Sequence, residues 1–297
     1  MSNVIFTMLV GLAGAGKSTY AKKLSEQTGA VICSSDEIRK ELYGDESIQG
    51  DSNKVFSRLQ KKVVENLKAG NSVIYDATNV SMKNRKGIMV AIRDFDVFKQ
   101  AVVIATPIDI CLRQDVARDR HVGKDVIIKM VKRFQMPILA EGFDDISIYY
   151  AGEEYKRYYT PCETFPRMLL NSPHDCKYHP ETIGQHLQNV VDSIKTKTRD
   201  TDLIQAAYLH DIGKCFCKEI GEDGEAHYYS HDSYGAYQSL FVEGVLNRVY
   251  VSALISWHMY PFFVNEDIEK MEKKFGKEFT RDLMILHEAD INGKGNE

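Results

Sequence analysis

The chain has 297 residues, enough for about two domains of roughly 150 residues each, and its 43% hydrophobic and 27% charged residues exclude a disordered, collagen-like or coiled-coil protein. The longest apolar stretch, Val4 to Ala13, is far shorter than the roughly 20 residues that cross a bilayer, so no membrane segment is expected. The stretch also does not resemble a secretory signal. Charge divides unevenly, because residues 1–160 carry 24 Lys and Arg against 20 Asp and Glu, whereas residues 161–297 carry 14 against 22.

Strand and helix signals alternate through the first half of the chain. The continuous apolar run Val4–Val10 predicts a strand that is buried on both faces. Strands separated by helices predict a parallel sheet with right-handed crossovers, the order of a doubly wound α/β domain. Further strands are expected at 30–33, 72–76 and 101–105, and helices after the glycine loop to Leu24, at 55–67, at 82–92 and at 126–134.

Beyond Tyr150 the strand signals disappear. Residues 151–173 contain charges, tyrosines and three prolines, which suits a connection, and only helical patterns separated by polar turns follow. We place the boundary near residue 160. The predicted fold is therefore an α/β domain over residues 1–160 followed by an all-α domain over residues 161–297.

The first predicted strand leads into a phosphate loop. Residues 11–18 fit G-x-x-x-x-G-K-[ST], and a predicted helix follows. Glycines let the backbone amides face the phosphates, Lys17 reaches the β and γ oxygens, and the Ser18 hydroxyl ligates Mg²⁺. ATP and Mg²⁺ are the expected cofactors. The expected nucleotide-binding residues are Gly11, Gly14, Ala15, Gly16, Lys17, Ser18 and Thr19.

Three further segments supply candidates for the acceptor side. Asp36 follows the second strand and could accept the proton of an attacking hydroxyl, while Arg39, one turn later, could pair with an acceptor phosphate. An ordinary helix cap with an i,i+3 ion pair is the alternative. Asp76 and Asn79 end the third strand and are expected near the substrate. Arg118 belongs to an arginine-rich segment that could neutralise the transferring phosphate or form a solvated helix face.

Together these residues resemble the phage-type polynucleotide 5′-hydroxyl kinases of the phosphate-loop kinase superfamily, over about residues 4–150. The resemblance implies Lys17 and Ser18 on the ATP phosphates and metal, and Asp36 as the general base. It also implies Arg39 on the 3′ phosphate of the acceptor nucleotide and Arg118 on the transferring phosphate. The family often has an arginine four residues before Arg118, where this chain has Gln114, so Arg113 or Arg120 could substitute.

Histidines gather in the second half, where eight of the nine lie after residue 170. His186, His210, His258 and Asp290 each continue an apolar helical stripe. Burying an unpaired imidazole or carboxylate costs several kcal/mol, so these groups are expected to share a partner, and a divalent metal suits them. For any single histidine, a satisfied core position is the alternative.

The sequence Ala-Ala-Tyr-Leu-His-Asp-Ile-Gly-Lys around His210 resembles the all-helical HD phosphohydrolase superfamily, over about residues 171–293. The resemblance implies metal ligation in the order H…HD…D, with Asp211 bridging two metals, and extra histidines in two-metal members. Lys214 could contact a substrate phosphate, and His179 could line the substrate entry. The implied metal ligands are His186, His210, Asp211, His231, His258 and Asp290, with Mn²⁺ as a suitable ion.

The predicted function combines both domains. The chain would phosphorylate 5′-hydroxyl ends of RNA or DNA and remove a 3′, 2′ or 2′,3′-cyclic phosphate, so that a separate RNA ligase can seal the ends. One alternative is a nucleoside or metabolite kinase fused to a nucleotide phosphohydrolase, and another is a regulator that binds nucleotide and RNA without chemistry. The six cysteines are scattered and form no Cys-x-x-Cys pair, so we expect reduced thiols and a cytoplasmic location.

Overall fold

The computed structural model describes residues 4–118, 121–175 and 180–294. The chain forms two compact units, the first made of Met1–Ile128 with Pro137–Ala151, and the second of Lys129–Met136 with Gly152–Glu297. The first unit therefore ends at Ala151, within ten residues of the expected boundary. The sequence did not predict that Lys129–Met136 belongs to the second unit although the segments on both sides of it belong to the first.

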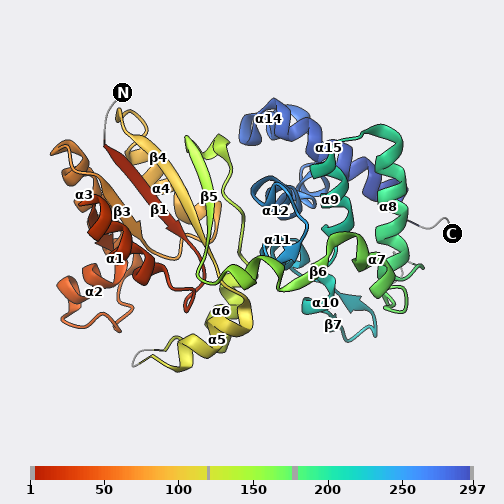
Figure 1. Ribbon diagram of the computed structural model, residues 1–297, viewed down its shortest axis with the longest axis horizontal. Helices are drawn as coiled ribbons and strands as arrows, with labels where there is room; N and C mark the ends of the chain where they lie inside the picture. The colour runs from red at the N-terminus through yellow and green to blue at the C-terminus, as the bar shows by residue number, and fades with distance from the viewer. Residues whose placement is uncertain (1–3, 119–120, 176–179, 295–297) are drawn as a thin grey trace. The chain divides into compact units, whose positions relative to one another are not determined.

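A five-stranded parallel sheet forms the centre of the first unit, in the order β2-β3-β1-β4-β5, with helices flanking it (Figure 1). The parallel α/β architecture predicted from the strand–helix alternation is confirmed. The edge strand β5 was not predicted, because its residues alternate between exposed and partly buried positions and give no continuous apolar run. The strands are β1 (Ile5–Val10), β2 (Val31–Ser34), β3 (Val73–Asp76), β4 (Phe98–Ala105) and β5 (Asp145–Tyr150).

The apolar stripe predicted at 55–67 forms a helix in the first unit. In α3, Val55, Leu59, Val63 and Leu67 are buried at the predicted spacing, and the Asp51 carboxylate caps the first turn. The helices are α1 (Lys17–Thr28), α2 (Ser35–Tyr43), α3 (Ser52–Lys68), α4 (Met82–Ala91), α5 (Ile108–Val116) and α6 (Lys124–Val131), of which α6 crosses the boundary between the units.

A buried ion pair fastens the late segment 137–151 to α4. Arg85 is completely buried, and its Nε and Nη2 atoms each donate to a Glu141 carboxylate oxygen at 2.7 Å. The same carboxylate accepts from the Ile138 backbone N–H at 3.1 Å, and Arg85 Nη1 donates to the Asn79 carbonyl at 3.0 Å. The bidentate geometry satisfies both charges, so this pair connects elements far apart in the sequence.

Replacing Glu141 with glutamine should therefore lower the free energy of unfolding of the first unit by about 3–5 kcal/mol, because Arg85 would keep a buried, unpaired charge. Urea denaturation followed by circular dichroism measures this change. Glu41→Gln is the matched control, since Glu41 pairs with Arg58 at the surface, where the side chains are 45% and 39% exposed. Equal urea midpoints for the two variants would contradict the structural role of the buried pair.

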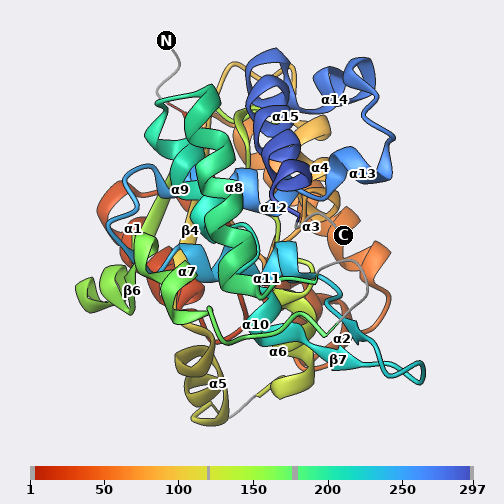
Figure 2. The same ribbon diagram turned by 90° about the vertical axis from the view of Figure 1, so that its right-hand side faces the viewer.

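The second unit is built mainly from helices, with α8 (Ile183–Lys197) packed against both α9 (Thr201–Leu209) and α15 (Lys277–Asn292) (Figure 2). It is not wholly helical as predicted, because β6 pairs with β9 in parallel and β7 pairs with β8 in antiparallel order. These strands have only two or three residues, too short to leave a pattern in the sequence. The strands are β6 (Tyr159–Pro161), β7 (Glu219–Ile220), β8 (Ala226–His227) and β9 (Val242–Glu243).

The segment Lys129–Met136 belongs to the core of the second unit. The Phe134 ring packs edge-on against Tyr237 with centroids 5.0 Å apart, and the Met136 N–H donates to the Ser256 hydroxyl at 3.0 Å. Among the described residues, no helix is long and apolar enough to cross a membrane. The helices of this unit are α7 (Phe165–Met168), α8 (Ile183–Lys197), α9 (Thr201–Leu209), α10 (Lys214–Cys217), α11 (His231–Ser239), α12 (Arg248–Trp257), α13 (Tyr260–Phe263), α14 (Ile268–Phe275) and α15 (Lys277–Asn292).

Candidate functional sites

The phosphate loop connects β1 to α1 and has the curled backbone that its glycines predict. Gly14 and Gly16 have φ values of 79° and 91°, in the left-handed region that favours glycine. A Cβ atom at Gly14 would also collide with the Cys111 carbonyl. The Gly11 N–H donates to the Thr78 carbonyl at 3.0 Å, which ties the loop to the end of β3.

Lys17, Ser18 and Asp76 form the polar centre of this loop. Lys17 Nζ donates to the Leu12 carbonyl at 2.7 Å, and the Ser18 hydroxyl donates to Asp76 Oδ2 at 2.9 Å. Burial lowers the pKa of Lys17 against the opposing charge of Asp76, and burial raises the pKa of Asp76 against the charge of Lys17. Asp76 was expected near the acceptor substrate. The structure instead makes it the direct partner of Ser18, so it lies where a Mg²⁺ ion on Ser18 would need a carboxylate.

Asp36 and Arg39 lie in the first turns of α2. Arg39 Nη1 donates to Asp36 Oδ1 at 2.5 Å, which is the i,i+3 pair that the alternative interpretation predicts. The Asp36 carboxylate is nevertheless 48% exposed, and its charge acts on both Lys17, whose pKa burial lowers, and Asp76, whose pKa burial raises. A carboxylate that is accessible and electrically coupled to the phosphate loop can receive a proton from an incoming hydroxyl.

The segment after α5 carries the predicted arginine. Arg118 is exposed, and its charge lowers the pKa of Lys17, so it lies within electrostatic reach of the loop. The buried Asp115 carboxylate accepts from the backbone N–H groups of Val122 and Gly123 at 3.1 Å and 2.9 Å, closing the segment at its base. Arg113 pairs with Asp109 at 3.2 Å and is 70% exposed, which matches a solvated helix face. Arg120 lies outside the described residues.

Asn79 has a structural position that the sequence did not indicate. Its side chain is 2% exposed, and Nδ2 donates to the carbonyls of Leu9 and Ala77 at 2.8 Å and 3.3 Å. Its backbone φ is 50°, which an asparagine tolerates. These bonds join the ends of β1 and β3, so the Asn79 amide nitrogen has acceptors within the protein.

A hollow of about 450 Å³ opens beside the phosphate loop on the surface of α1. Its lining includes Ser18, Lys22, Lys23 and Glu26, so it has an excess of positive charge. Exposed lysines of this kind attract phosphate groups in a way that does not depend on base sequence.

The second unit brings together all six residues predicted to hold metals. They lie within helices or next to helix ends: His186 in α8, His210 and Asp211 directly after α9, His231 at the start of α11, His258 directly after α12, and Asp290 in α15. The side chains of all six are nearly or completely buried. Residues separated by more than one hundred positions in the sequence therefore meet at one place in the fold.

The six residues divide into two groups of three. One group is His186, His210 and Asp290, the other is Asp211, His231 and His258, and the ligand atoms within each group lie within 4.8 Å of one another. Asp211 joins the groups, because Oδ2 lies 3.4 Å from His186 Nε2 and Oδ1 lies 3.3 Å from His231 Nε2. This is the arrangement of a carboxylate between two cation positions.

The orientation of the rings is fixed by hydrogen bonds at their outer nitrogen. The Nδ1 atoms of His210, His231 and His258 each lie 2.8–2.9 Å from the carbonyl three residues earlier. A carbonyl only accepts, so each Nδ1 carries the proton and each Nε2 turns a lone pair toward the centre. His186 Nδ1 lies 3.3 Å from the Glu181 carboxylate, which gives it the same orientation.

Distances between the inner nitrogens support bound cations. His186 Nε2 and His210 Nε2 are 3.3 Å apart, and His231 Nε2 and His258 Nε2 are 3.1 Å apart. In the second pair two lone pairs would repel each other at this distance, whereas a divalent cation held by both would be stabilised. In the first pair His186 Nε2 also lies 3.1 Å from Asp290 Oδ1, to which it can donate. The donor set of imidazole nitrogens and carboxylates fits zinc or a first-row transition metal such as Mn²⁺.

Burial and neighbouring charges act differently on the members of the two groups. Burial lowers the pKa of His258 to about 4, so that imidazole is neutral as a ligand must be. Burial would raise the pKa of Asp211, but the charge of Lys214 above all holds it well below its usual range. Although burial opposes it, hydrogen bonds to Asp290 and Glu181 raise the pKa of His186 to about 9. The carboxylates of Asp211, Asp290 and Glu181 thus carry more negative charge than the single positive charge of Lys214 balances.

Close packing around Asp211 depends on a glycine. A Cβ atom at Gly213 would collide with the His231 carbonyl, so only glycine lets the turn after α9 approach the start of α11 this closely. The approach brings His231 within reach of Asp211.

Two residues that contact the histidine groups or their neighbours, Glu181 and His174, were not assigned a role from the sequence. Glu181 contacts His186 through its carboxylate and accepts from His174 Nδ1 at its backbone carbonyl at 2.8 Å. His174 is 1% exposed, and Lys214 Nζ donates to its Nε2 at 3.2 Å and to Asp211 Oδ2 at 2.7 Å. Their positions before the first ligand helix give no periodic signal, so only the histidine enrichment pointed toward them. His179, predicted at the substrate entry, lies outside the described residues.

Metal addition should stabilise the second unit if these groups bind cations. After EDTA treatment, Mn²⁺ at about 1,000 times its Kd is expected to raise the free energy of unfolding by on the order of 4 kcal/mol per site. Differential scanning calorimetry measures the corresponding rise in Tm. His186→Ala should lose much of the rise, while His287→Ala, which removes a buried histidine outside both groups, should retain it. No shift in the parent protein would contradict metal binding.

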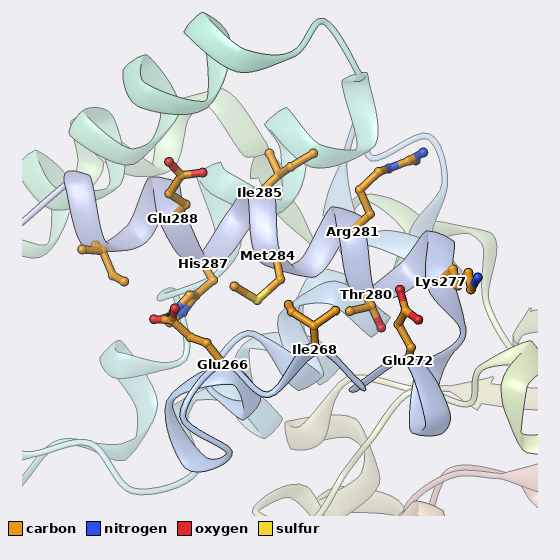
Figure 3. A pocket seen from close by; sticks show the side chains of 11 residues that line it. Glu266, Ile268, Glu272, Lys277, Thr280, Arg281, Met284, Ile285, His287 and Glu288 are labelled. Carbon is orange, nitrogen blue, oxygen red and sulfur yellow. Dashed lines mark hydrogen bonds and ion pairs between the residues drawn. The ribbon is translucent and has the colours of Figure 1, made fainter. Parts of the chain in front are cut away.

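A separate cavity of about 490 Å³ lies along α14 and α15 (Figure 3). Its lining combines the apolar side chains of Ile268, Met284 and Ile285 with His287, whose Nε2 lies 3.1 Å from Glu266 Oε1. None of the six metal-type residues lines it. This cavity is therefore not the entrance to the histidine groups.

Comparisons with known proteins concern the first unit. Residues 6–137 match a family model described as an AAA domain. An L-seryl-tRNA(Sec) kinase of Methanococcus maripaludis is 29% identical over 44% of this chain and 52% of its own length. A bifunctional polynucleotide phosphatase/kinase of Schizosaccharomyces pombe is 26% identical over 47% of this chain and 32% of its own length. The chain thus spans about half or less of the curated relatives it matches.

Among solved structures, a chain of a Pnkp1/Rnl/Hen1 RNA repair complex matches with 23% identity and a TM-score of 0.40, covering 44% of this chain and 43% of the other. The curated relatives are both kinases by name, and the residues that match the family model include the phosphate loop. The first unit is therefore a phosphate-loop α/β domain, and the chain is similar to two kinases, one of which is a polynucleotide phosphatase/kinase.

Proposed function

We propose that this chain is a bifunctional enzyme that heals nucleic-acid ends, most directly those of broken RNA. The first unit would transfer the γ-phosphoryl group of ATP to a 5′-hydroxyl. The second would remove a 3′ or 2′ phosphate or open a 2′,3′-cyclic phosphate, leaving ends that a separate RNA ligase could seal. The observation that carries the proposal is that one chain contains both a phosphate loop coupled to Asp36 and two buried histidine–aspartate groups joined by Asp211.

In the kinase reaction, the acceptor oxygen would bond to phosphorus as the bond between phosphorus and ADP breaks. Asp36 would receive the hydroxyl proton, and Lys17 and Arg118 would neutralise charge on the transferring group. Ser18 and Asp76 would hold Mg²⁺ on the β and γ phosphates. Arg39 would pair with a phosphate of the acceptor. Its Nε is buried without a hydrogen-bond partner, consistent with a guanidinium whose donors are not all used within the protein.

In the phosphohydrolase reaction, water would attack phosphorus and an ester oxygen would leave. The six ligand residues would hold one or two divalent metals, which polarise a phosphoryl oxygen and acidify water when bound. The chain's own residues orient this chemistry, because the carbonyl-bound Nδ1 atoms fix the imidazoles and Asp211 keeps the two positions together. Lys214 would contact the substrate phosphate from its position 2.7 Å from Asp211.

The names of the two curated relatives indicate acceptors on a polynucleotide and on a tRNA. The polynucleotide acceptor is supported by Arg39 beside the exposed Asp36 and by the lysine-lined hollow near Ser18. The relative that phosphorylates a seryl-tRNA favours a second candidate, in which Asp36 serves a hydroxyl other than an RNA end.

One substrate tests the whole proposal. An RNA with a 5′-hydroxyl and a 2′,3′-cyclic phosphate, labelled internally, is incubated with the full chain, ATP, Mg²⁺ and Mn²⁺, and both ends are analysed. Gain of a 5′ phosphate and loss of the terminal phosphate are expected. No change at either end would contradict the proposal, while phosphorylation of seryl-tRNA but not of RNA ends would favour the second candidate. ATP binding without turnover of any substrate would favour a regulator.

A further inference from the structure

Lys214 is held by two different acceptors beside the histidine groups. Its side chain is 7% exposed, and Nζ donates to Asp211 Oδ2 at 2.7 Å and to His174 Nε2 at 3.2 Å. The Tyr228 ring covers it, with 5.6 Å from Nζ to the ring centroid. An ammonium has three N–H donors, and among the described residues only these two acceptors bond to it.

The protonation of His174 follows from its neighbours. The Glu181 carbonyl, 2.8 Å from His174 Nδ1, has no proton to give, so Nδ1 must be the donor. The ammonium of Lys214 has no lone pair, so Nε2 must be the acceptor. His174 is therefore a neutral imidazole in one tautomer. The hydroxyl of Tyr228, which donates to the His174 carbonyl, also fixes the backbone at this residue.

A neutral second acceptor changes what Lys214 can do. With Asp211 alone, the flexible lysine could form a closed ion pair in several rotamers. With His174 as well, two donors are fixed in direction and no further negative charge is added, so the ammonium keeps a third donor for an anion at the metal groups. Holding the charge in place before an anion binds avoids the entropy cost of ordering it afterwards.

From this juxtaposition we infer that His174 is a positioning residue that directs the Lys214 ammonium toward the phosphate bound at the histidine groups. The inference rests on the proposed phosphohydrolase function. His174 itself touches neither the substrate nor the reacting atoms. It acts through Lys214, and its own ring is held by Glu181, the residue whose carboxylate also contacts His186.

The test measures binding of inorganic phosphate to the Mn²⁺-loaded full chain by isothermal titration calorimetry, with bound manganese counted by plasma mass spectrometry. His174→Ala should weaken phosphate binding about tenfold or more, because a hydrogen bond to a charged group is lost. His174→Gln, whose amide oxygen can replace Nε2 as acceptor, should recover to within about threefold of the parent chain. Lys214→Met should lose binding at least as fully as His174→Ala.

Manganese content separates positioning from ligation. His174→Ala should retain the parental metal content, whereas His186→Ala should lose metal. The matched control His287→Gln makes the same substitution at a buried histidine outside the site and should leave phosphate affinity unchanged. In hydrolysis of a terminal phosphate, His174→Ala should raise KM more than it lowers kcat, because a binding contact has been misplaced.

Three results would overturn the inference: unchanged phosphate affinity in His174→Ala, loss of metal in that variant, or no recovery in His174→Gln when its Tm equals that of the parent. Failure of the proposed function is recognised separately, because the parent chain itself would then bind no phosphate and hydrolyse no ester. That result would overturn both proposals, whereas a failure confined to the variants would overturn only the role of His174.

Discussion

His210→Ala should abolish removal of the terminal phosphate while leaving 5′-end phosphorylation at the parental rate. The substitution takes an imidazole from the group that contains His186 and Asp290, and it removes the nitrogen 3.3 Å from His186 Nε2. Metal ions contribute several kcal/mol of charge stabilisation in such reactions, so the expected loss is on the order of a thousandfold in rate. Release of phosphate from the labelled RNA measures it.

The same preparation supplies the control. Phosphorylation of the 5′ end reports that the first unit is folded, and a circular dichroism spectrum equal to that of the parent reports that the helices remain. His227→Ala removes a histidine that is 37% exposed, pairs with Asp223 in the hairpin and stacks on Tyr229, so it should keep the phosphatase rate. If His210→Ala retained full phosphatase activity, or lost both activities while folded, the assignment of separate sites would be wrong.

Asp36→Ala should have the reciprocal effect, with a loss of about 10²–10⁴ in the rate of end phosphorylation and no change in phosphate removal. The reason is that the exposed carboxylate coupled to Lys17 and Asp76 would no longer receive the proton of the acceptor hydroxyl. Because Asp36 also pairs with Arg39, the substitution should raise the KM for the RNA as well. Steady-state kinetics with a 5′-hydroxyl oligonucleotide and radiolabelled ATP resolve the two effects.

Glu37→Gln is the matched control for Asp36, since the neighbouring carboxylate lies in the same turn of α2 but pairs with Lys62 at 3.3 Å. It should keep the parental kinetics. Asp36→Asn distinguishes general-base chemistry from pairing, because an amide can still accept from Arg39 but cannot take a proton. Parental kcat in Asp36→Asn would remove Asp36 from the chemical step and leave it the helix-internal pair of the alternative interpretation.

The sequence predicted those parts of the fold whose residues repeat at a helical or strand period. The stripe from Val55 to Leu67 and the apolar run before the phosphate loop are of this kind, since burial imposes their spacing. The edge strand β5, the short strand pairs of the second unit and the exchange of Lys129–Met136 depend on contacts between distant residues. Phe134 gives no local sign that its partner is Tyr237.

The same distinction applies to the sites. Motifs identified Lys17, Ser18 and the six metal-type residues because their chemistry fixes residue types and local spacing. Asp76 is bonded to Ser18, and Asn79 joins two strand ends, which the sequence did not indicate because only the fold determines where a strand end points. Glu181 and His174 are joined to the metal groups by hydrogen bonds that no spacing rule describes.

The course of the backbone between the two units also limits how they can be cut apart. The chain passes from one unit to the other after Ile128, after Met136 and after Ala151, so a single protease cut cannot release either half. A fragment that started at Gly152 would lack Phe134 and Met136 and would leave Tyr237 and Ser256 without the neighbours they have in the intact protein. Expression of the histidine-bearing half by itself is therefore expected to need residues 129–136 grafted back, for instance by circular permutation.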